Sequence, residues 1–285
     1  MDFITKLILE RNRDRELLNS EDAERIARFV ADKQGYELKD VVTGETYEKN
    51  PKLNGLYSFD QNIIGYFDNK RIDYVFEAAT NFRELYHPDG AFIDSANFFF
   101  LVCITHEIAH LRQAHICNSP RSSVEKRLFK PFMNFKEGDK IYDENHDDIP
   151  LEVNAENVGY ITAYNIFKRL PKSKFITEYD QRIYQLATLK WLLFGNYNID
   201  PKSEEVYCPY ERIADHFDQE VLNKMNMSID DYAKLIYNND NLTLYKKLML
   251  GLPITYKEYA YVNILIDELS NDMNINGIKK LEKKL

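Results

Sequence analysis

The sequence predicts an α+β fold that is mainly α-helical. Apolar residues recur at helical spacing over much of the chain, and the apolar segment 98–116 contains neither Gly nor Pro. In contrast, residues 36–86 alternate short aromatic and β-branched runs with Gly, Asn, Pro and Asp, which is typical of a small sheet. With 285 residues, of which 44% are hydrophobic, the chain can bury a core as one large domain or two modest ones.

The N-terminal third is predicted to hold two helices followed by the sheet. Residues 2–10 are apolar, and Ser20 is expected to cap an amphipathic helix that ends at Gly35. The apolar runs expected to form strands are 41–43, 56–59, 63–67 and 72–76. The last run is ambiguous, because residues 71–85 fit a helix equally well.

Two long helices are predicted in the middle of the chain. The first covers 98–116, where both helix faces are apolar, and its N-cap is expected at Asp94 or Ser95. The second covers 150–170 and starts with Pro, which is favourable in a first helical turn. Between them, residues 117–149 form a polar, irregular insert in this prediction, and we expect the insert to lie near the functional site.

The remaining residues, 171–285, are predicted to be helical, either as a second domain or as part of one domain with residues 1–170. The expected helices are 176–194, 209–224, 229–237, 240–250 and 256–272. The breaks between them contain Gly195, Pro201, Pro209, Gly251 and Pro253.

Composition and charge exclude several functional classes. A net charge of −9 argues against a nucleic-acid partner, since no basic stripe occurs outside the last few residues. Three cysteines without a CxxC pair predict neither a disulfide framework nor a thiolate zinc site, and they favour a reducing compartment. The N-terminus becomes charged too early for a signal peptide, so we expect a cytoplasmic protein without a membrane segment.

The helix predicted at 98–116 contains an HExxH pentapeptide. Its histidines, His106 and His110, lie on one helix face at positions i and i+4, so both can direct a ring nitrogen at one zinc ion. Glu107 is rotated by about 100° from the first histidine, so it does not reach the metal but can reach a water bound to the metal. This arrangement predicts a zinc-dependent hydrolase with Glu107 as the general base.

A catalytic zinc normally has three protein ligands and leaves a fourth position for water, so the motif needs a partner. His115 lies about 180° around the helix from the first motif histidine, and we expect it to be a core or helix-end residue. On the second helix, Glu152 and Glu156 share a face with Gly159 and Ala163, whose small size allows another helix to approach. Glu152 is the preferred candidate and Glu156 is the alternative.

HExxH followed by the string Glu152-Val-Asn-Ala155-Glu156 resembles the glutamate-zincin metallopeptidases, within residues 98–170. The resemblance implies a zincin-like core of small sheet, HExxH helix and glutamate helix, with a bound zinc. It also implies that Glu152 is the third ligand and that Glu156 orients a ligand histidine. The sequence departs from the family at Glu156, where Asp or Asn is more usual, so the choice between the two glutamates stays open.

The motif, the chain length and the N-terminus are also similar to intracellular bacterial and prophage zincins, including the Lit-type phage-exclusion peptidases. That similarity implies cleavage of a specific intracellular protein, in phage defence or regulation. An edge strand of the sheet could pair with an extended peptide substrate, or the strands could simply cover the helix. The alternatives are an inactive zincin scaffold that binds proteins and a metal hydrolase of a non-peptide substrate. The candidate oxyanion donors are His146, Tyr160, Tyr207 and His216.

Overall fold

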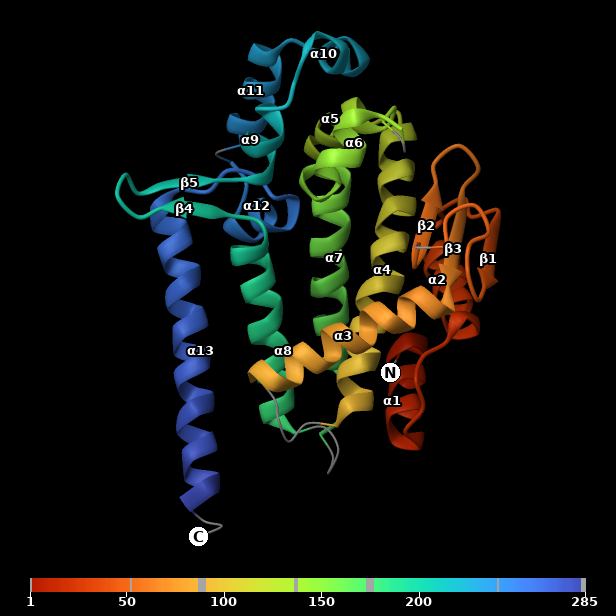
Figure 1. Ribbon diagram of the computed structural model, residues 1–285, viewed down its shortest axis with the longest axis vertical. Helices are drawn as coiled ribbons and strands as arrows, with labels where there is room; N and C mark the ends of the chain where they lie inside the picture. Colours follow the sequence, from red (N-terminus) through yellow and green to blue (C-terminus); the bar gives the residue numbers. More distant parts are fainter. Residues whose placement is uncertain are drawn as a thin grey trace.

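The computed structural model is mainly helical with a small mixed sheet, which confirms the predicted α+β class (Figure 1). It describes residues 2–51, 53–86, 91–135, 138–172, 177–239 and 241–282.

The first elements are α1 (Phe3–Asp14), α2 (Ser20–Gln34), β1 (Asp40–Gly44), β2 (Gly55–Ser58), β3 (Ile63–Phe67), α3 (Asp68–Tyr86) and α4 (Phe92–Asn118). The middle elements are α5 (Val124–Phe129), η1 (Lys130–Phe132), α6 (Lys140–Asn145), η2 (His146–Asp148) and α7 (Pro150–Phe167). The last are α8 (Glu178–Lys190), the π-turn η3 (Trp191–Gly195), β4 (Asn198–Asp200), β5 (Glu205–Tyr207), α9 (Pro209–Ala214), α10 (Gln219–Met225), α11 (Ile229–Tyr237), α12 (Leu244–Leu250) and α13 (Tyr256–Glu282).

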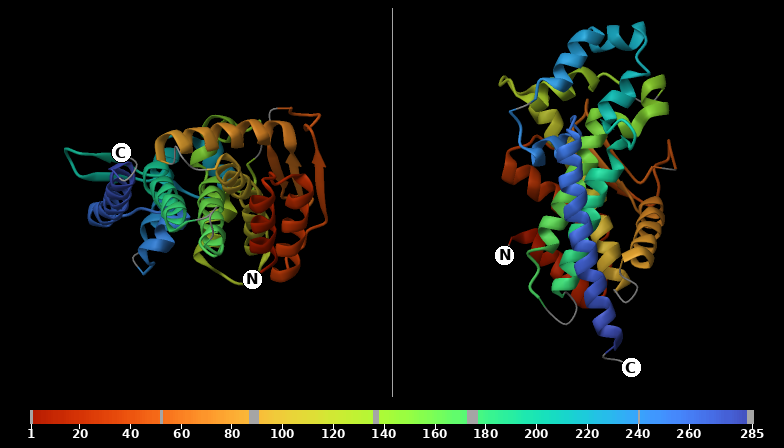
Figure 2. Two further views of the ribbon diagram at one scale, coloured as in Figure 1. Left: turned by 90° about the horizontal axis from the view of Figure 1, so that it is seen from below. Right: turned by 90° about the vertical axis from the view of Figure 1, so that its left-hand side faces the viewer.

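The helices α13, α8, α7 and α4 lie in a row, with α1, α2 and the three-stranded sheet beyond α4 (Figures 1 and 2). One cluster of buried apolar side chains extends from Ile4 in α1 to Ile266 in α13. By length and composition α4 could cross a membrane, but 78% of its most apolar 18-residue window is buried inside the protein. The apolar character of α4 is therefore explained by its place between other helices.

The sheet has the strand order β1-β3-β2, so β2 lies at one edge. β1 pairs in parallel with β3, and β2 pairs antiparallel with β3 in a register that places Leu56 opposite Gly65. Three of the predicted strands are confirmed, and the segment 72–76, for which strand and helix were equally expected, belongs to α3. Its apolar residues Val75, Ala79 and Phe82 are buried at positions i, i+4 and i+7, which is one face of a helix.

Helices α4 and α7 pack closely at a glycine. The Thr105 hydroxyl of α4 donates to the carbonyl of Gly159 in α7 at 3.3 Å. A Cβ atom on Gly159 would lie only 2.9 Å from the carbonyl oxygen of Val102, so a larger residue would push the helices apart. This contact confirms that the small residue below the two glutamates permits close approach.

Both expected N-caps in the first half of the chain are wrong. The cap of α2 is Asn19, which accepts a hydrogen bond from the amide of Asp22 and forms a capping box with it. Ala91 precedes α4 and makes no side-chain cap, while Asp94 lies inside the first turn. In α2 the capping side chain lies one residue before the expected cap, and α4 begins before the expected caps. Hydrophobic periodicity does not locate a helix end to within one or two residues.

The expected irregular insert at 117–149 is also wrong, since it contains α5, η1, α6 and η2. Ser123 caps α5 by accepting from the amide of Lys126. These helices are too short for hydrophobic periodicity to reveal, and contacts with distant residues such as Lys224 and Lys246 hold them in place.

The helical C-terminal region is confirmed, with two differences in detail. The helix predicted at 209–224 is divided into α9 and α10, because Asp218 caps a new helix by accepting from the amide of Val221. The hairpin β4–β5 was not predicted, and its strands have only three residues each. Residues 176 and 240, which begin two of the predicted helices, lie outside the described part of the chain.

Candidate metal centre

Three side chains from α4 and α7 bring one donor atom each to a common point. The Nε2 atoms of His106 and His110 are 3.1 Å apart. Oε2 of Glu152 lies 3.3 Å from the first of these nitrogens and 3.2 Å from the second. The cluster of His106, His110 and Glu152 could hold a metal ion.

The distances between the donor atoms fit a small tetrahedral ion. With zinc–ligand bonds of about 2.0–2.1 Å, tetrahedral ligand atoms lie roughly 3.3 Å apart. The three donor distances of 3.1, 3.2 and 3.3 Å are close to this value. Two imidazole nitrogens and a carboxylate oxygen are ligands that zinc accepts, but other transition metals accept the same set.

Hydrogen bonds on the outer side of each histidine ring fix its orientation. Nδ1 of His106 is 2.9 Å from Oε2 of Glu156, and Nδ1 of His110 is 2.8 Å from Oε1 of Gln113. Gln113 donates its own amide protons to the carbonyl of Leu151 and to Asn154, so its oxygen can only accept. Nδ1 therefore carries a proton in both histidines, so a metal would bind through their Nε2 atoms.

The cluster is rich in negative charge. Three carboxylates, from Glu107, Glu152 and Glu156, surround the two histidines. Burial alone would lower the pKa of His106, but its bonds to Glu152 and Glu156 outweigh burial and raise the pKa well above the ordinary value. Burial alone would raise the pKa of Glu152, but His110 and His106 pull it well below the ordinary value. A divalent cation would offset this charge and displace the proton from His106.

Glu107 lies beside the cluster and under the edge strand. It is 7% exposed, and its Oε2 atom accepts no hydrogen bond from the described residues. Burial raises the pKa of its carboxyl group, although the two motif histidines act in the opposite direction. A Cβ atom on Gly55 of β2 would lie 2.6 Å from Oε1 of Glu107, so the close approach of strand and carboxylate depends on glycine.

Strand β2 presents alternate residues to the motif helix. Gly55 faces Glu107, and Tyr57 on the same face lies beside the ring of His110, as does Phe59 in the turn that follows the strand. The Tyr57 ring stacks at a centroid distance of 6.4 Å, and the Phe59 ring meets the imidazole edge-on at 5.7 Å. The strand therefore restricts the histidine ring while its outer edge stays unpaired in the described sheet.

Among the candidate oxyanion donors, the structure brings His146 to the cluster. Its Nε2 atom lies 3.7 Å from Oε1 of Glu152, and its side chain is 45% exposed at the mouth of the site. This residue starts η2, so the end of the segment 117–149 does reach the site as expected. Burial would lower the pKa of His146, but Asp147 and Glu152 raise it above the ordinary value, which favours a donating imidazolium.

The other candidates have different surroundings. Tyr160 is buried and stacks on Trp191 at a centroid distance of 4.8 Å. Tyr207 is exposed in the β4–β5 hairpin and donates to Glu205, and His216 is exposed beyond α9. His115 is exposed and packs against Tyr36, outside the cluster of donor atoms. We therefore retain only His146.

Sequence reasoning missed the roles of Gln113 and Gly55. Gln113 lies three residues after His110, so a search for acceptors one helical turn beyond each motif histidine would have found it. Gly55 has no comparable local signal, because its role depends on how β2 lies on α4.

No protein-family model, curated protein or solved structure matches this chain. The resemblance to glutamate zincins therefore rests on the motif residues alone.

Proposed function

We propose that the protein is a zinc-dependent endopeptidase of the glutamate-zincin kind that cleaves a specific intracellular protein in the cytoplasm. The observation that carries the proposal is the convergence of three donor atoms from His106, His110 and Glu152, with the buried carboxylate of Glu107 beside them. A hydrolase needs this combination of metal ligands and a general base.

In this proposal each side chain has a separate task. Glu107 takes a proton from the attacking water onto its unpartnered Oε2 and later delivers it to the leaving amine. A zinc ion held by the three ligands would acidify that water and polarise the scissile carbonyl. His146 donates to the oxyanion that develops at the carbonyl, and Glu156 and Gln113 keep the ligand rings oriented.

The position of β2 favours a peptide over other substrates. Its outer edge is free in the described sheet, and Gly55 lies directly over Glu107. An extended peptide that pairs with this edge would pass beside the general base. We therefore prefer the peptidase to a hydrolase of a non-peptide substrate.

The decisive experiment compares wild type with Glu107→Gln. The substitution keeps the shape of the side chain and removes its basicity, so proteolysis should fall roughly 10²–10⁴-fold. New protein N-termini in expressing cells would be identified by proteomics, and metal content would be measured on the purified proteins. Glu220→Gln, on the exposed surface of α10, provides the matched control.

Two results would contradict the proposal. If the purified wild type contains no zinc and has no affinity for it, the metal site is wrong. If Glu107→Gln retains the full biological effect, the chain acts as a binding scaffold without catalysis. Activity on lysate proteins but not on mixed small non-peptide esters would separate the peptidase from the remaining alternative.

A further inference from the structure

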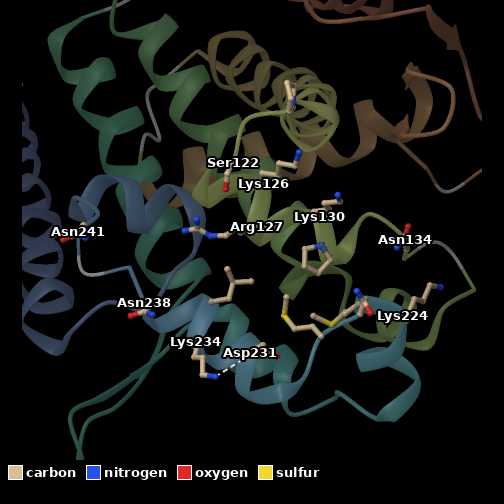
Figure 3. A pocket seen from close by; sticks show the side chains of 16 residues that line it. Ser122, Lys126, Arg127, Lys130, Asn134, Lys224, Asp231, Lys234, Asn238 and Asn241 are labelled. Carbon is tan, nitrogen blue, oxygen red and sulfur yellow. Dashed lines mark ion pairs between the residues drawn. The ribbon is translucent and has the colours of Figure 1, made fainter.

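A cavity of about 1060 Å³ lies between the α5–η1 segment and the α10–α11 segment (Figure 3). We call it the basic pocket, because its lining includes five cations, Lys126, Arg127, Lys130, Lys224 and Lys234. Only one carboxylate, that of Asp231, belongs to the described lining. This excess of positive charge is opposite to the net charge of −9 of the whole chain.

Three of these cations have no carboxylate partner among the described residues. Lys224 pairs with Asp139 at 2.6 Å. Lys234 lies 3.5 Å from Asp231 (Figure 3). Lys126 donates only to a neutral backbone carbonyl, that of Ser119. Arg127 and Lys130 are exposed and form no ion pair within the described part of the chain. The α5–η1 wall therefore carries about three uncompensated charges.

The spacing of these charges indicates the kind of anion that would bind. Lys126 and Arg127 belong to α5 and Lys130 begins η1, so three positive charges occur within five consecutive residues on one wall of the pocket. Linked phosphate groups concentrate several negative charges in a small volume, and Arg binds them through paired hydrogen bonds. Acidic side chains on one face of an extended peptide are about 7 Å apart, which suits three neighbouring cations less well.

The rest of the lining fits a flat, partly apolar group. Met225 is buried in the cavity wall, with Met227 and Leu235 half-buried beside it. Methionine thioethers pack well against aromatic rings. Asn238 and Asn241 are part of the same lining, and their amides can both donate to and accept from the edge of a base.

We propose that the basic pocket binds a nucleoside polyphosphate, with its phosphates on Lys126, Arg127 and Lys130 and its base against the methionines. The site lies outside the metal cluster and shares no residue with it. The inference therefore goes beyond the proposed peptidase and does not depend on it.

Calorimetric titration of the full chain with ATP, GTP, inorganic triphosphate and an oligoglutamate peptide would test the proposal. We expect ATP or GTP to bind more tightly than triphosphate, and both more tightly than the peptide. Arg127→Glu combined with Lys130→Glu should weaken nucleotide binding at least about tenfold, since charge-assisted contacts are lost and like charges introduced. Lys39→Glu combined with Lys202→Glu changes the net charge equally at exposed positions outside the lining and should leave the affinity unchanged.

Several outcomes would overturn the proposal. These are the absence of nucleotide binding, preferential binding of the peptide, and equal weakening by the two double variants. Nucleotide binding that the pocket variant retains would place the ligand elsewhere, for example at the metal cluster. Equal affinity for triphosphate and nucleotides would overturn the role of the methionines. Melting temperatures would verify folding, and Arg127→Gln with Lys130→Gln would replace the charge reversal if that variant unfolds.

Discussion

The three donor atoms can act as one site only if neighbouring side chains hold the histidine rings in the right orientation. Glu156 and Gln113 accept from the Nδ1 atoms of the two motif histidines, and the Nε2 atoms are thereby directed inward. The different positions of the two glutamates on α7 follow from the same contacts. Glu152 reaches both Nε2 atoms, whereas Glu156 reaches only the outer nitrogen of His106. This geometry favours Glu152 as the ligand in our proposal.

At Gly55 a single added methyl group should separate catalysis from metal binding. In Gly55→Ala the new Cβ would lie 2.6 Å from Oε1 of Glu107, so the carboxylate must move. Because the obstructing atom ends a flexible side chain, we expect a small loss of stability but a fall in kcat of about tenfold to a hundredfold. Steady-state kinetics and metal analysis would measure the two effects.

Gly44→Ala is the matched control, because the nearest atom to its new Cβ would be the carbonyl oxygen of Thr46 at 3.7 Å. It should leave activity unchanged. Equal loss of activity in the two glycine variants, or loss of zinc in Gly55→Ala, would contradict the positioning role of Gly55.

At the scale of elements, the distance between α4 and α7 determines whether the three donor atoms meet. Gly159→Ala should gain about 1 kcal/mol from helix propensity, but overpacking against the Val102 backbone costs about 1–3 kcal/mol. We expect net destabilisation and, as the helices separate, zinc affinity lower by about tenfold. Urea denaturation and competitive zinc titration would measure these changes.

Ala163→Gly lies one turn along the same face and provides the comparison. It should destabilise the protein by about 1–2 kcal/mol, through lower helix propensity and the loss of a buried methyl group, and leave zinc affinity unchanged. Unchanged zinc affinity in Gly159→Ala would show that the helix spacing tolerates a methyl group.

The sequence predicts those elements whose own composition is decisive. The helices α4 and α7 are long apolar segments, and β1 to β3 are short aromatic and β-branched runs bounded by turn residues. Helix α3 is ambiguous because Ile72 to Phe76 is rich in β-branched and aromatic residues, and only the burial of Val75, Ala79 and Phe82 decides for a helix. The short helices α5 and α6 depend on distant ion pairs, which no local pattern reveals.

At the scale of the whole molecule, the helical region that follows α7 supports the site without contributing donor atoms to the cluster. Arg212 of α9 forms two hydrogen bonds with Asp148 of η2, next to His146, and Asn154 and Asn157 of α7 donate to carbonyls in α12. The basic pocket likewise combines segments that are about a hundred residues apart in the sequence. For this reason the distribution of charge along the sequence does not reveal the basic pocket.

Zinc binding should make the stability of the whole chain depend on pH. The pKa of His106 is raised in the folded, metal-free protein, so its protonated form contributes stability that is present below its unfolded pKa. This contribution is lost as pH rises through the folded pKa, whereas deprotonation lets zinc bind and stabilise. We expect zinc to raise the melting temperature by roughly 5–10 °C at mildly alkaline pH and by little near pH 5.

Thermal denaturation with zinc or with a chelator, over the range of about pH 5 to 8, would measure this difference. Calcium is the appropriate control, because it prefers oxygen ligands and a larger coordination number than two histidines and one carboxylate provide. If calcium stabilises the protein as much as zinc does, the stabilising ion binds to carboxylates elsewhere. If zinc stabilises equally at all pH values, protons do not compete for its ligands, and the assignment of His106 as a metal ligand is wrong.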